Sequence, residues 1–323
     1  MAQTQVGWIG LGSMGIGMSK NLQKYLITIS APPLIYTNRT LSRGESLKEL
    51  GGIPVESVEE VAKKSEIIFS CVSNDAILQE TTEKIIASGR IEGKIYVDCS
   101  TVHPDTSIKI AKQISEAGGQ FVASPVFGAS PVADNGKLLF VTAGPSSATS
   151  RIEPYIKDVM GRAIMPMGED VSRSSLLKIA GNILVVSFME VISEAHVFAE
   201  KTGLGSEILE TMIGDNFGPV LGSYSKRLTT GAYAPESNGK AGFDAPLAMK
   251  DARHAINCAG AVGVKLPVSE VGLRNLESAE AYANEIGGRA IDSSSMYGTL
   301  RRVAGLDFYT DLCLMRDGKG LPN

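Results

Sequence analysis

The first half of the chain alternates short apolar runs with stretches of helical period, and this alternation most constrains the fold. Between most of the runs lie segments such as SVEEVAKK and TSIKIAKQISEA, whose apolar residues recur at the spacing of one helix face. The runs are VGWI (6–9), LIYT (34–37), IIFSC (67–71), IYVD (95–98), QFVAS (120–124) and LLFVTA (138–143). Strand alternating with helix implies parallel βαβ units with right-handed crossovers. We therefore predict a doubly wound α/β sheet, with its ligand at the carboxyl ends of the strands.

A second region begins near residue 171, where helical periods continue with few strand-like runs. The chain has 323 residues, which is more than one hydrophobic core usually holds, so two domains are expected. We predict an α/β domain at residues 1–168 and an all-helical domain at residues 169–323, joined by a long interdomain helix. Composition predicts a loop at 231–242 and a loose tail at RDGKGLPN, residues 316–323.

Composition and charge narrow the class of function. A formal net charge of -4 and a pI near 5.6 leave no basic surface for nucleic acid or an anionic membrane. The first residues lead directly into an apolar strand, so we expect neither a targeting segment nor an apolar run long enough to span a bilayer. We therefore expect a cytoplasmic protein that acts on a small molecule. Neither a disulfide framework nor a metal site is indicated by the cysteines and histidines, which are Cys71, Cys99, Cys258, Cys313, His103, His196 and His254.

The glycines Gly10, Gly12 and Gly15 form a G-x-G-x-x-G pattern directly after the first strand, where a helical pattern begins. The first glycine permits a tight turn, the second lets a pyrophosphate approach the backbone, and the third lets helix and strand pack closely. The pattern alone is weak, but here it stands in the strand, loop and helix context that a dinucleotide requires. We predict a Rossmann-type cofactor site that includes Leu11, Ser13 and Met14.

The end of the second strand indicates which dinucleotide binds. Domains that select NAD place an acidic residue there, to hold the ribose 2′-hydroxyl. This chain reads YTNRT, with Asn38, Arg39 and Thr40 and no carboxylate. A guanidinium can pair with a 2′-phosphate, and the neighbouring polar side chains can donate hydrogen bonds. We therefore predict NADP(H) in preference to NAD(H).

Four motifs in order resemble the β-hydroxyacid dehydrogenase family, which includes 3-hydroxyisobutyrate dehydrogenase and the glyoxylate/succinic semialdehyde reductases. GLGSMGIGMSKNL is similar to the family's N-terminal cofactor signature, and DCST at 98–101 resembles its D-G-S-T loop, with cysteine in place of glycine. KIAGN at 178–182 resembles the interdomain-helix motif, and FDAPLAMKDARHA at 243–255 resembles the F-x-x-x-L-x-x-K-D segment. The likeness covers nearly the whole chain except its tail.

This resemblance implies a role for each matching position. Lys178 would be the general acid/base, and Asn182 would hold the lysine or the substrate. Substrate carboxylate and the nicotinamide end would meet Ser100 and Thr101, and Val72 and Ser73 would line the adenosine and ribose side. Phe243 and Lys250 would close over the cofactor, and the helical domain would form a homodimer or homotetramer.

The chain departs from the family in its substrate loop. The family commonly reads P-V-S-G-G there, whereas this chain has Phe127, Gly128 and Ala129 after Pro125 and Val126. A phenyl ring replaces a hydroxyl donor, which leaves backbone amides and Ser130 to hold a carboxylate. We expect a modified or more apolar substrate.

A lysine suits the expected chemistry. Hydride transfer to a carbonyl leaves an alkoxide, which needs a proton from a group within hydrogen-bond reach. Lysine in water has a pKa near 10.4, and partial burial lowers the pKa of such a group, which makes it a better acid. Leu176, Leu177, Ile179, Ile183 and Leu184 flank Lys178 and are expected to give it an apolar environment.

The remaining titratable residues are expected to play structural parts. We interpret His196 as structural and His103 as local scaffolding beside a helix start, while His254 shares a predicted helix face with Lys250. Glu190 and Glu194 are expected to face solvent or a subunit boundary.

The prediction is thus an NADP(H)-dependent oxidoreductase that interconverts a small β-hydroxyacid and its aldehyde or semialdehyde. Two alternatives stay open, an imine reductase on the same fold and a non-catalytic NADP(H)-binding protein.

Overall fold

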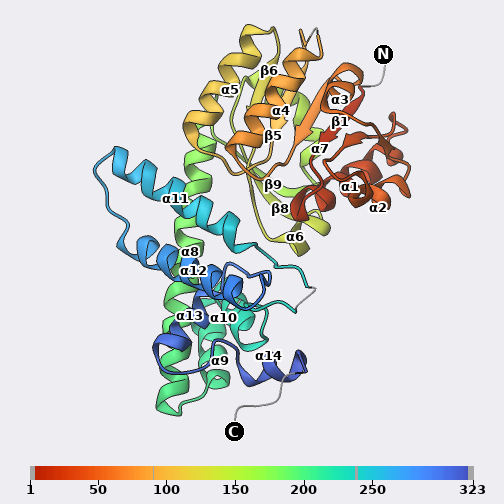
Figure 1. The fold of residues 1–323 in the computed structure, drawn as a ribbon. Helices are drawn as coiled ribbons and strands as arrows, with labels where there is room; N and C mark the ends of the chain where they lie inside the picture. Colours follow the sequence, from red (N-terminus) through yellow and green to blue (C-terminus); the bar gives the residue numbers. More distant parts are fainter. Residues whose placement is uncertain (1–3, 90, 237–238, 319–323) are drawn as a thin grey trace. The chain divides into compact units, whose positions relative to one another are not determined.

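The computed structural model describes residues 4–89, 91–236 and 239–318 (Figure 1). The chain forms two compact units, residues 1–178 and 179–323. The division falls within one long helix, α8 (Val171–Thr202), whereas the sequence placed the domain boundary just before that helix, after residue 168.

The first unit contains a six-stranded parallel sheet. Its strand order is β3-β2-β1-β4-β5-β6, which is the order of a Rossmann-type fold and confirms the predicted class. The central strands are buried along their length, because helices cover both faces of a parallel sheet and leave apolar runs without alternation. The strands are β1 (Val6–Ile9), β2 (Ile35–Thr37), β3 (Ile53–Pro54), β4 (Ile67–Ser70), β5 (Ile95–Asp98) and β6 (Gln120–Ala123).

Helices pack on both faces of this sheet and form two separate apolar cores. One core takes side chains from α1 (Ser13–Thr28), α2 (Glu45–Lys48) and α7 (Ser146–Ile156). The other takes side chains from α3 (Val58–Lys64), α4 (Asp75–Ala87) and α5 (Pro104–Glu116). A short 3₁₀ helix, η1 (Leu41–Gly44), follows β2. The sheet is therefore covered on both sides, as the alternation in the sequence predicts.

A second, three-stranded sheet follows, in the order β7-β8-β9. It consists of β7 (Val126–Phe127), β8 (Leu138–Thr142) and β9 (Gly161–Pro166), and the short helix α6 (Ser130–Asp134) connects the first two strands. The prediction that the run at 138–143 belongs to the doubly wound sheet was therefore wrong. The connection from β7 to β8 is too short for a crossover of a dozen or more residues, so these two strands pair antiparallel.

The regular secondary structure in the described part of the second unit is helical, as predicted. Besides the later part of α8 it contains α9 (Ser206–Phe217), α10 (Pro219–Thr229), α11 (Ala245–Ala261), α12 (Pro267–Glu285), α13 (Met296–Val303) and α14 (Asp311–Arg316). One apolar core joins these helices. The described part of the predicted loop at 231–242 forms neither helix nor strand, and residues 237–238 lie outside the described residues.

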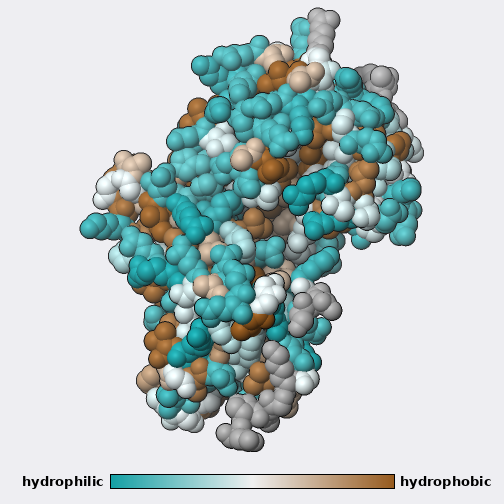
Figure 2. All heavy atoms as spheres, in the orientation of Figure 1, coloured by the Kyte–Doolittle hydropathy of each residue, from teal (hydrophilic) through white to brown (hydrophobic). Residues whose placement is uncertain are grey.

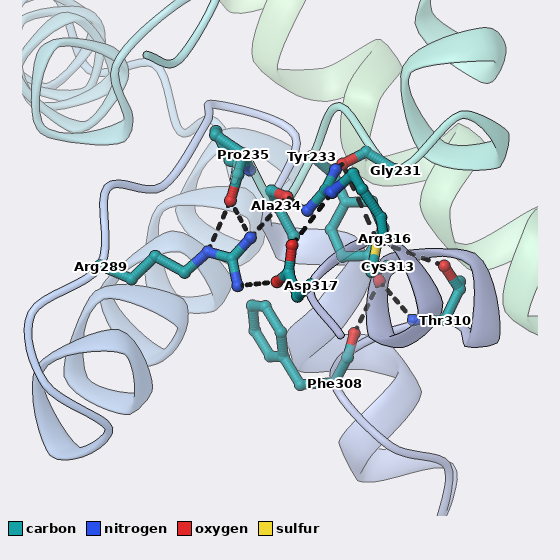
Figure 3. Close-up of polar contacts among 10 residues, drawn as sticks. All are labelled: Gly231, Tyr233, Ala234, Pro235, Arg289, Phe308, Thr310, Cys313, Arg316 and Asp317. Carbon is teal, nitrogen blue, oxygen red and sulfur yellow. Dashed lines mark hydrogen bonds and ion pairs between the residues drawn. The ribbon is translucent and has the colours of Figure 1, made fainter. Parts of the chain in front are cut away.

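The C-terminal segment is fastened to the rest of the second unit, so the prediction of a loose tail was wrong for its first residues (Figure 3). Arg316 Nη2 donates to the Ala234 carbonyl at 2.6 Å, and Arg289 Nε donates to the Pro235 carbonyl at 2.5 Å. The Asp317 carboxylate pairs with both guanidinium groups. These partners are distant in sequence, which is why local composition does not reveal them. Residues 319–323 of the predicted tail lie outside the described residues.

Helix α8 overturns the expectation that no apolar run could span a bilayer. Its most apolar window has a mean hydropathy of 1.7, which by length and composition would suffice to cross a membrane. The signal is weak, because a core helix passes the same test. Buried polar side chains along α8 are typical of a helix that faces protein; they are Ser174, Ser175, Asn182, Glu190, Ser193 and His196.

Candidate functional site

The loop between β1 and α1 has the shape that a dinucleotide requires. Gly10 has φ +94°, and a Cβ there would lie 2.3 Å from the Cys71 carbonyl oxygen. At Gly15 a Cβ would lie 2.2 Å from the Gly10 carbonyl oxygen. A Cβ on Gly12, by contrast, would meet no protein atom within 4 Å. Gly12 therefore leaves open space at the start of α1, where backbone N–H groups favour a phosphate, and the residues present fit a dinucleotide.

Side chains hold this loop in position from two directions. The Trp8 indole N–H donates to the Gly10 carbonyl at 2.8 Å. From β2, Asn38 Oδ1 accepts the Leu11 N–H at 2.8 Å, while its Nδ2 donates to the Thr40 carbonyl at 2.8 Å. Asn38 thus ties the cofactor loop to the segment that sequence analysis assigned to the ribose. Arg39 and Thr40 are exposed, and their predicted cofactor contacts stay predictions.

The ends of β4 and β5 are joined by a buried hydroxyl network. Ser100 accepts the Val72 N–H at 2.8 Å and donates its proton to Asp98 Oδ1 at 2.7 Å. Ser70 also bonds to Asp98 Oδ1, at 2.7 Å. A serine hydroxyl has a single proton to donate, so in this arrangement Ser100 gives it to Asp98 rather than to a ligand. Its predicted substrate contact therefore stays a prediction, as does that of half-buried Thr101. The predicted cofactor contacts of Val72 and exposed Ser73 stay predictions as well.

The predicted substrate loop lies next to the cofactor helix. Asn21 on α1 donates to the Ala133 carbonyl of α6 at 2.8 Å, and a Cβ on Gly17 would come within 2.6 Å of Asp134. The Ser130 hydroxyl lies 3.8 Å from the Met14 sulfur. This close packing brings the loop of Phe127, Gly128 and Ala129 to the helix that follows the glycine loop.

The first turns of α8 are fixed to the first unit by two buried serines. Ser174 Oγ donates to the Ala123 carbonyl at 3.0 Å, and Ser175 Oγ lies 2.8 Å from Ser107 Oγ. Lys178 follows within one turn and is half-buried, with its Nζ 4.5 Å from the centroid of the Phe127 ring. The structure therefore brings together a predicted catalytic residue and a predicted substrate residue that are distant in sequence.

The apolar environment predicted for Lys178 is only partly present. Ile179 is buried, but Leu176 is 45% exposed and Leu184 is 55% exposed. A helix presents successive residues around its whole circumference, so neighbours in sequence do not all surround one side chain. Phe127, rather than these two leucines, supplies apolar surface to the lysine.

In the second unit, Asn182 belongs to a buried polar network that sequence reasoning missed. Its Nδ2 donates to Asp251 Oδ2 at 2.6 Å, and the other oxygen of Asp251 pairs with Lys250 Nζ at 2.9 Å. Asp251 therefore orients two residues that the family resemblance singled out. The K-D pair in FDAPLAMKDARHA was the available signal, but only the lysine was assigned a role.

Phe243, the other predicted cofactor contact of the second unit, is held at its backbone. Its N–H donates to Asp292 at 3.0 Å, and that buried carboxylate also pairs with Arg227. The Phe243 side chain packs half-buried against the helical core. Its contact with a cofactor stays a prediction.

Two histidines have the structural parts expected of them. His196 is buried, with Nε2 2.7 Å from Ser225 Oγ, and burial lowers its pKa. His103 caps α5, accepting the Asp105 N–H at its Nδ1. No role of His254 is tested.

Glu190 was wrongly predicted to face solvent or a subunit boundary. It is buried on α8 and accepts a hydrogen bond from Asn275 Nδ2 at 2.5 Å. Burial raises the pKa of this carboxyl to about 7. Glu194, four residues further along the chain, is exposed. The amide of Asn275 satisfies one oxygen of Glu190, which is how an acidic side chain is accommodated in the core.

Within the described residues, no group of three or more histidine, cysteine and acidic side chains could hold a metal ion. None of the four cysteines, all of which lie within the described residues, forms a disulfide bond. Burial raises the pKa of Cys99 well above its usual value, so this thiol in the DCST loop is held protonated.

Comparison with known families matches nearly the whole chain. Residues 5–168 match the family model described as the NAD binding domain of 6-phosphogluconate dehydrogenase. Residues 173–300 match the model described as NAD-binding of NADP-dependent 3-hydroxyisobutyrate dehydrogenase.

Individual relatives agree with these matches. An NADH-dependent oxidoreductase of Aspergillus ustus is 31% identical over 300 residues, covering 92% of this chain and 99% of the relative. Glyoxylate/succinic semialdehyde reductase 1 of Arabidopsis thaliana is 32% identical over 269 residues, covering 82% of this chain and 89% of the relative. The structure of 3-hydroxyisobutyrate dehydrogenase of Mycobacterium tuberculosis with L-serine superposes with a TM-score of 0.76 at 20% identity, covering 93% and 99% of the two chains.

Proposed function

Because the chain belongs to the β-hydroxyacid dehydrogenase family, a family of NAD(P)-dependent oxidoreductases, we propose that it interconverts a small β-hydroxyacid and its aldehyde or semialdehyde, with NADP(H) as cofactor. The observation that carries the proposal is the placement of Lys178. Its helix is anchored to the unit that holds the glycine loop, and its ammonium lies over the predicted substrate residue Phe127.

In the proposed reaction, Lys178 moves the proton. A bound reduced nicotinamide would supply a hydride to the carbonyl carbon of the substrate, and negative charge would develop on the carbonyl oxygen. The Lys178 ammonium donates its proton to that oxygen, and the products are an alcohol and a neutral amine. In the oxidative direction the neutral amine takes the hydroxyl proton. Asp251 accepts a hydrogen bond from the Asn182 amide and thereby keeps this side chain oriented.

The proposal of NADP(H) rests on the polar end of β2. Asn38, Arg39 and Thr40 provide a guanidinium and hydrogen-bond donors and no carboxylate, which suits a 2′-phosphate. The name of the Aspergillus relative states NADH, so the choice of cofactor needs a direct comparison of the two. We propose reduction as the physiological direction, consistent with NADPH.

We also propose that the enzyme is a homodimer or homotetramer that works in the cytoplasm. The support for assembly is an apolar stripe along α8, where Leu184, Phe188, Val191 and Phe198 are exposed at helical spacing. On α9, Ile208 and Met212 are also exposed, and apolar side chains appear at the surface in this part of the chain (Figure 2). Four cysteines without a disulfide bond among them suit a reducing compartment. Sedimentation should give a dimer or larger species, and a monomer would contradict the assembly.

The test is consumption of NADPH with a panel of carbonyl substrates. Glyoxylate, succinic semialdehyde, methylmalonate semialdehyde and tartronate semialdehyde would each be followed by absorbance, with NADH in parallel. We expect turnover with at least one of them, and a higher kcat/KM for NADPH than for NADH.

Other outcomes would select a different function. A cyclic imine reduced at a rate equal to that of the best aldehyde would favour the imine reductase alternative. Binding of NADPH without turnover on any substrate would favour the non-catalytic alternative. A preference for NADH would overturn the assignment of Arg39.

A further inference from the structure

The ring of Phe127 lies beneath the Lys178 ammonium, with 4.5 Å between Nζ and the ring centroid. This distance is within the range in which a cation is attracted by the negative face of an aromatic ring. The two residues come from different elements, strand β7 and helix α8, so the contact is not a consequence of local sequence.

The backbone on the Phe127 side of the contact is closely fixed. Val126 is buried and pairs with Phe140 on β8, while Phe127 itself pairs with Leu139. Gly128 has φ +130°, and a Cβ there would lie 2.7 Å from Leu138 Cδ2, so only glycine fits after the ring. The strand pairing and this turn together set where the ring points.

The helix on the lysine side is fixed as well. Ser174 and Ser175 are buried and hydrogen-bonded to groups of the first unit, at the carbonyl of Ala123 and at Ser107. Lys178 lies four residues after Ser174, which is one turn along the helix. The Cα of the lysine is therefore well positioned, while the position of the ammonium at the end of the four-carbon stem depends on the contacts of the side chain.

We propose that Phe127 is a positioning residue for Lys178, holding the ammonium over the ring face. This inference rests on the proposed role of Lys178 as proton donor. Attraction by the ring restricts the positions of the ammonium. The proposed proton transfer requires the ammonium within hydrogen-bond reach of the carbonyl oxygen of the substrate. The ring therefore acts through the lysine.

The experiment replaces the ring in steps and measures kcat, KM and the dissociation constant of NADPH. Phe127→Leu keeps an apolar side chain but removes the π face, whereas Phe127→Tyr keeps the face. Incorporation of phenylalanine carrying one, two or three ring fluorines weakens the negative face with little change in shape. We expect kcat for reduction to fall about fivefold to tenfold in Phe127→Leu and to stay within about twofold in Phe127→Tyr. Along the fluorinated series kcat should decline stepwise, while NADPH affinity stays constant.

A second measurement reports on the contact without activity. Protons above an aromatic ring resonate upfield, so the Lys178 ε-methylene protons should be shifted upfield in a spectrum of lysine-labelled enzyme. The signal is assigned by its absence in Lys178→Met. It should move to the ordinary lysine position in Phe127→Leu and remain shifted in Phe127→Tyr.

The outcomes separate this inference from the proposed function. If the wild-type enzyme reduces no carbonyl substrate, the proposed function is wrong, whatever the position of the lysine signal in the spectrum. An active wild-type enzyme whose kcat is the same across the fluorinated series would overturn the role of Phe127. An unshifted lysine signal in the wild-type enzyme would also overturn it, and unchanged melting temperatures would show that the variants are folded.

Discussion

The glycine loop at residues 10–15 and the polar network around Asp251 hold their functional groups in opposite ways. The loop relies on backbone, because Gly10 and Gly15 are packed against carbonyl oxygens and Gly12 faces open space. The network relies on side chains, because the buried carboxylate of Asp251 orients Asn182 and pairs with Lys250. A site built from backbone, such as the glycine loop, is therefore disturbed by an added side-chain atom. A site built from charged side chains, such as the Asp251 network, is disturbed by the loss of a charge.

The largest expected effect is on the side-chain network. Asp251→Ala leaves the largely buried ammonium of Lys250 without its carboxylate, so we expect the free energy of unfolding to fall by about 3 to 5 kcal/mol. Arg253→Ala on the same helix is the matched control. It breaks an ion pair with Glu277 in which both side chains are about half exposed, and should cost less than about 1 kcal/mol. Urea unfolding measures both, and equal losses would contradict the comparison.

A second buried carboxylate, that of Glu190, extends the comparison to the pH dependence of stability. Burial raises the pKa of Glu190 from 4.5 to about 7, although the hydrogen bond from Asn275 opposes the shift. The folded protein thus holds this proton more tightly than the unfolded chain. The stability due to Glu190 is complete below pH 4.5 and is lost as the pH rises to about 7.

The free energy of unfolding of the wild-type protein should therefore fall by about 2 to 3 kcal/mol as the pH rises over this interval, and Glu190→Gln should abolish this fall. Unfolding measured at several pH values checks it. Glu194→Gln, at the exposed neighbour, should leave the pH slope as it is in the wild-type protein. If the slope survives Glu190→Gln, another group is responsible for it.

Substitutions in the glycine loop are expected to change stability least. They also distinguish an effect on cofactor binding from an effect on folding. In Gly15→Ala the new methyl meets the Gly10 carbonyl, which should lower stability by about 1 to 3 kcal/mol and weaken NADPH binding. Gly12→Ala meets no protein atom and should leave the melting temperature unchanged, yet weaken NADPH binding at least about tenfold if the pyrophosphate lies there. Cofactor titration and thermal melting distinguish them. An unchanged NADPH affinity in Gly12→Ala would show that the pyrophosphate does not lie at this position.

Sequence reasoning recovered the features that local chemistry dictates. The strands β1, β2, β4, β5 and β6 are apolar runs long enough to recognise, and the glycine pattern follows from steric need. The strands β3 and β7, with two residues each, are too short to show a period, and β9 is largely exposed.

Features that depend on distant partners were missed. Asp251 meets Asn182 across 69 positions of the chain, and although the K-D pair draws attention to Asp251, it does not indicate Asn182 as the partner. Glu190 looked like a surface residue because Asn275, which makes its burial tolerable, lies on another helix. Arg316 and Asp317 looked like a loose tail for the same reason, since their partners, the Ala234 carbonyl and Arg289, are distant in sequence.

The most direct test of the central claim, that Lys178 supplies the proton, is chemical rescue of Lys178→Ala. Turnover with NADPH and the best carbonyl substrate would be measured with increasing ethylamine, beside a titration of NADPH binding. The account predicts that turnover falls at least about 100-fold, that NADPH affinity is unchanged, and that ethylamine restores turnover in proportion to its concentration. Turnover of Lys178→Ala at the wild-type rate without the amine would contradict it.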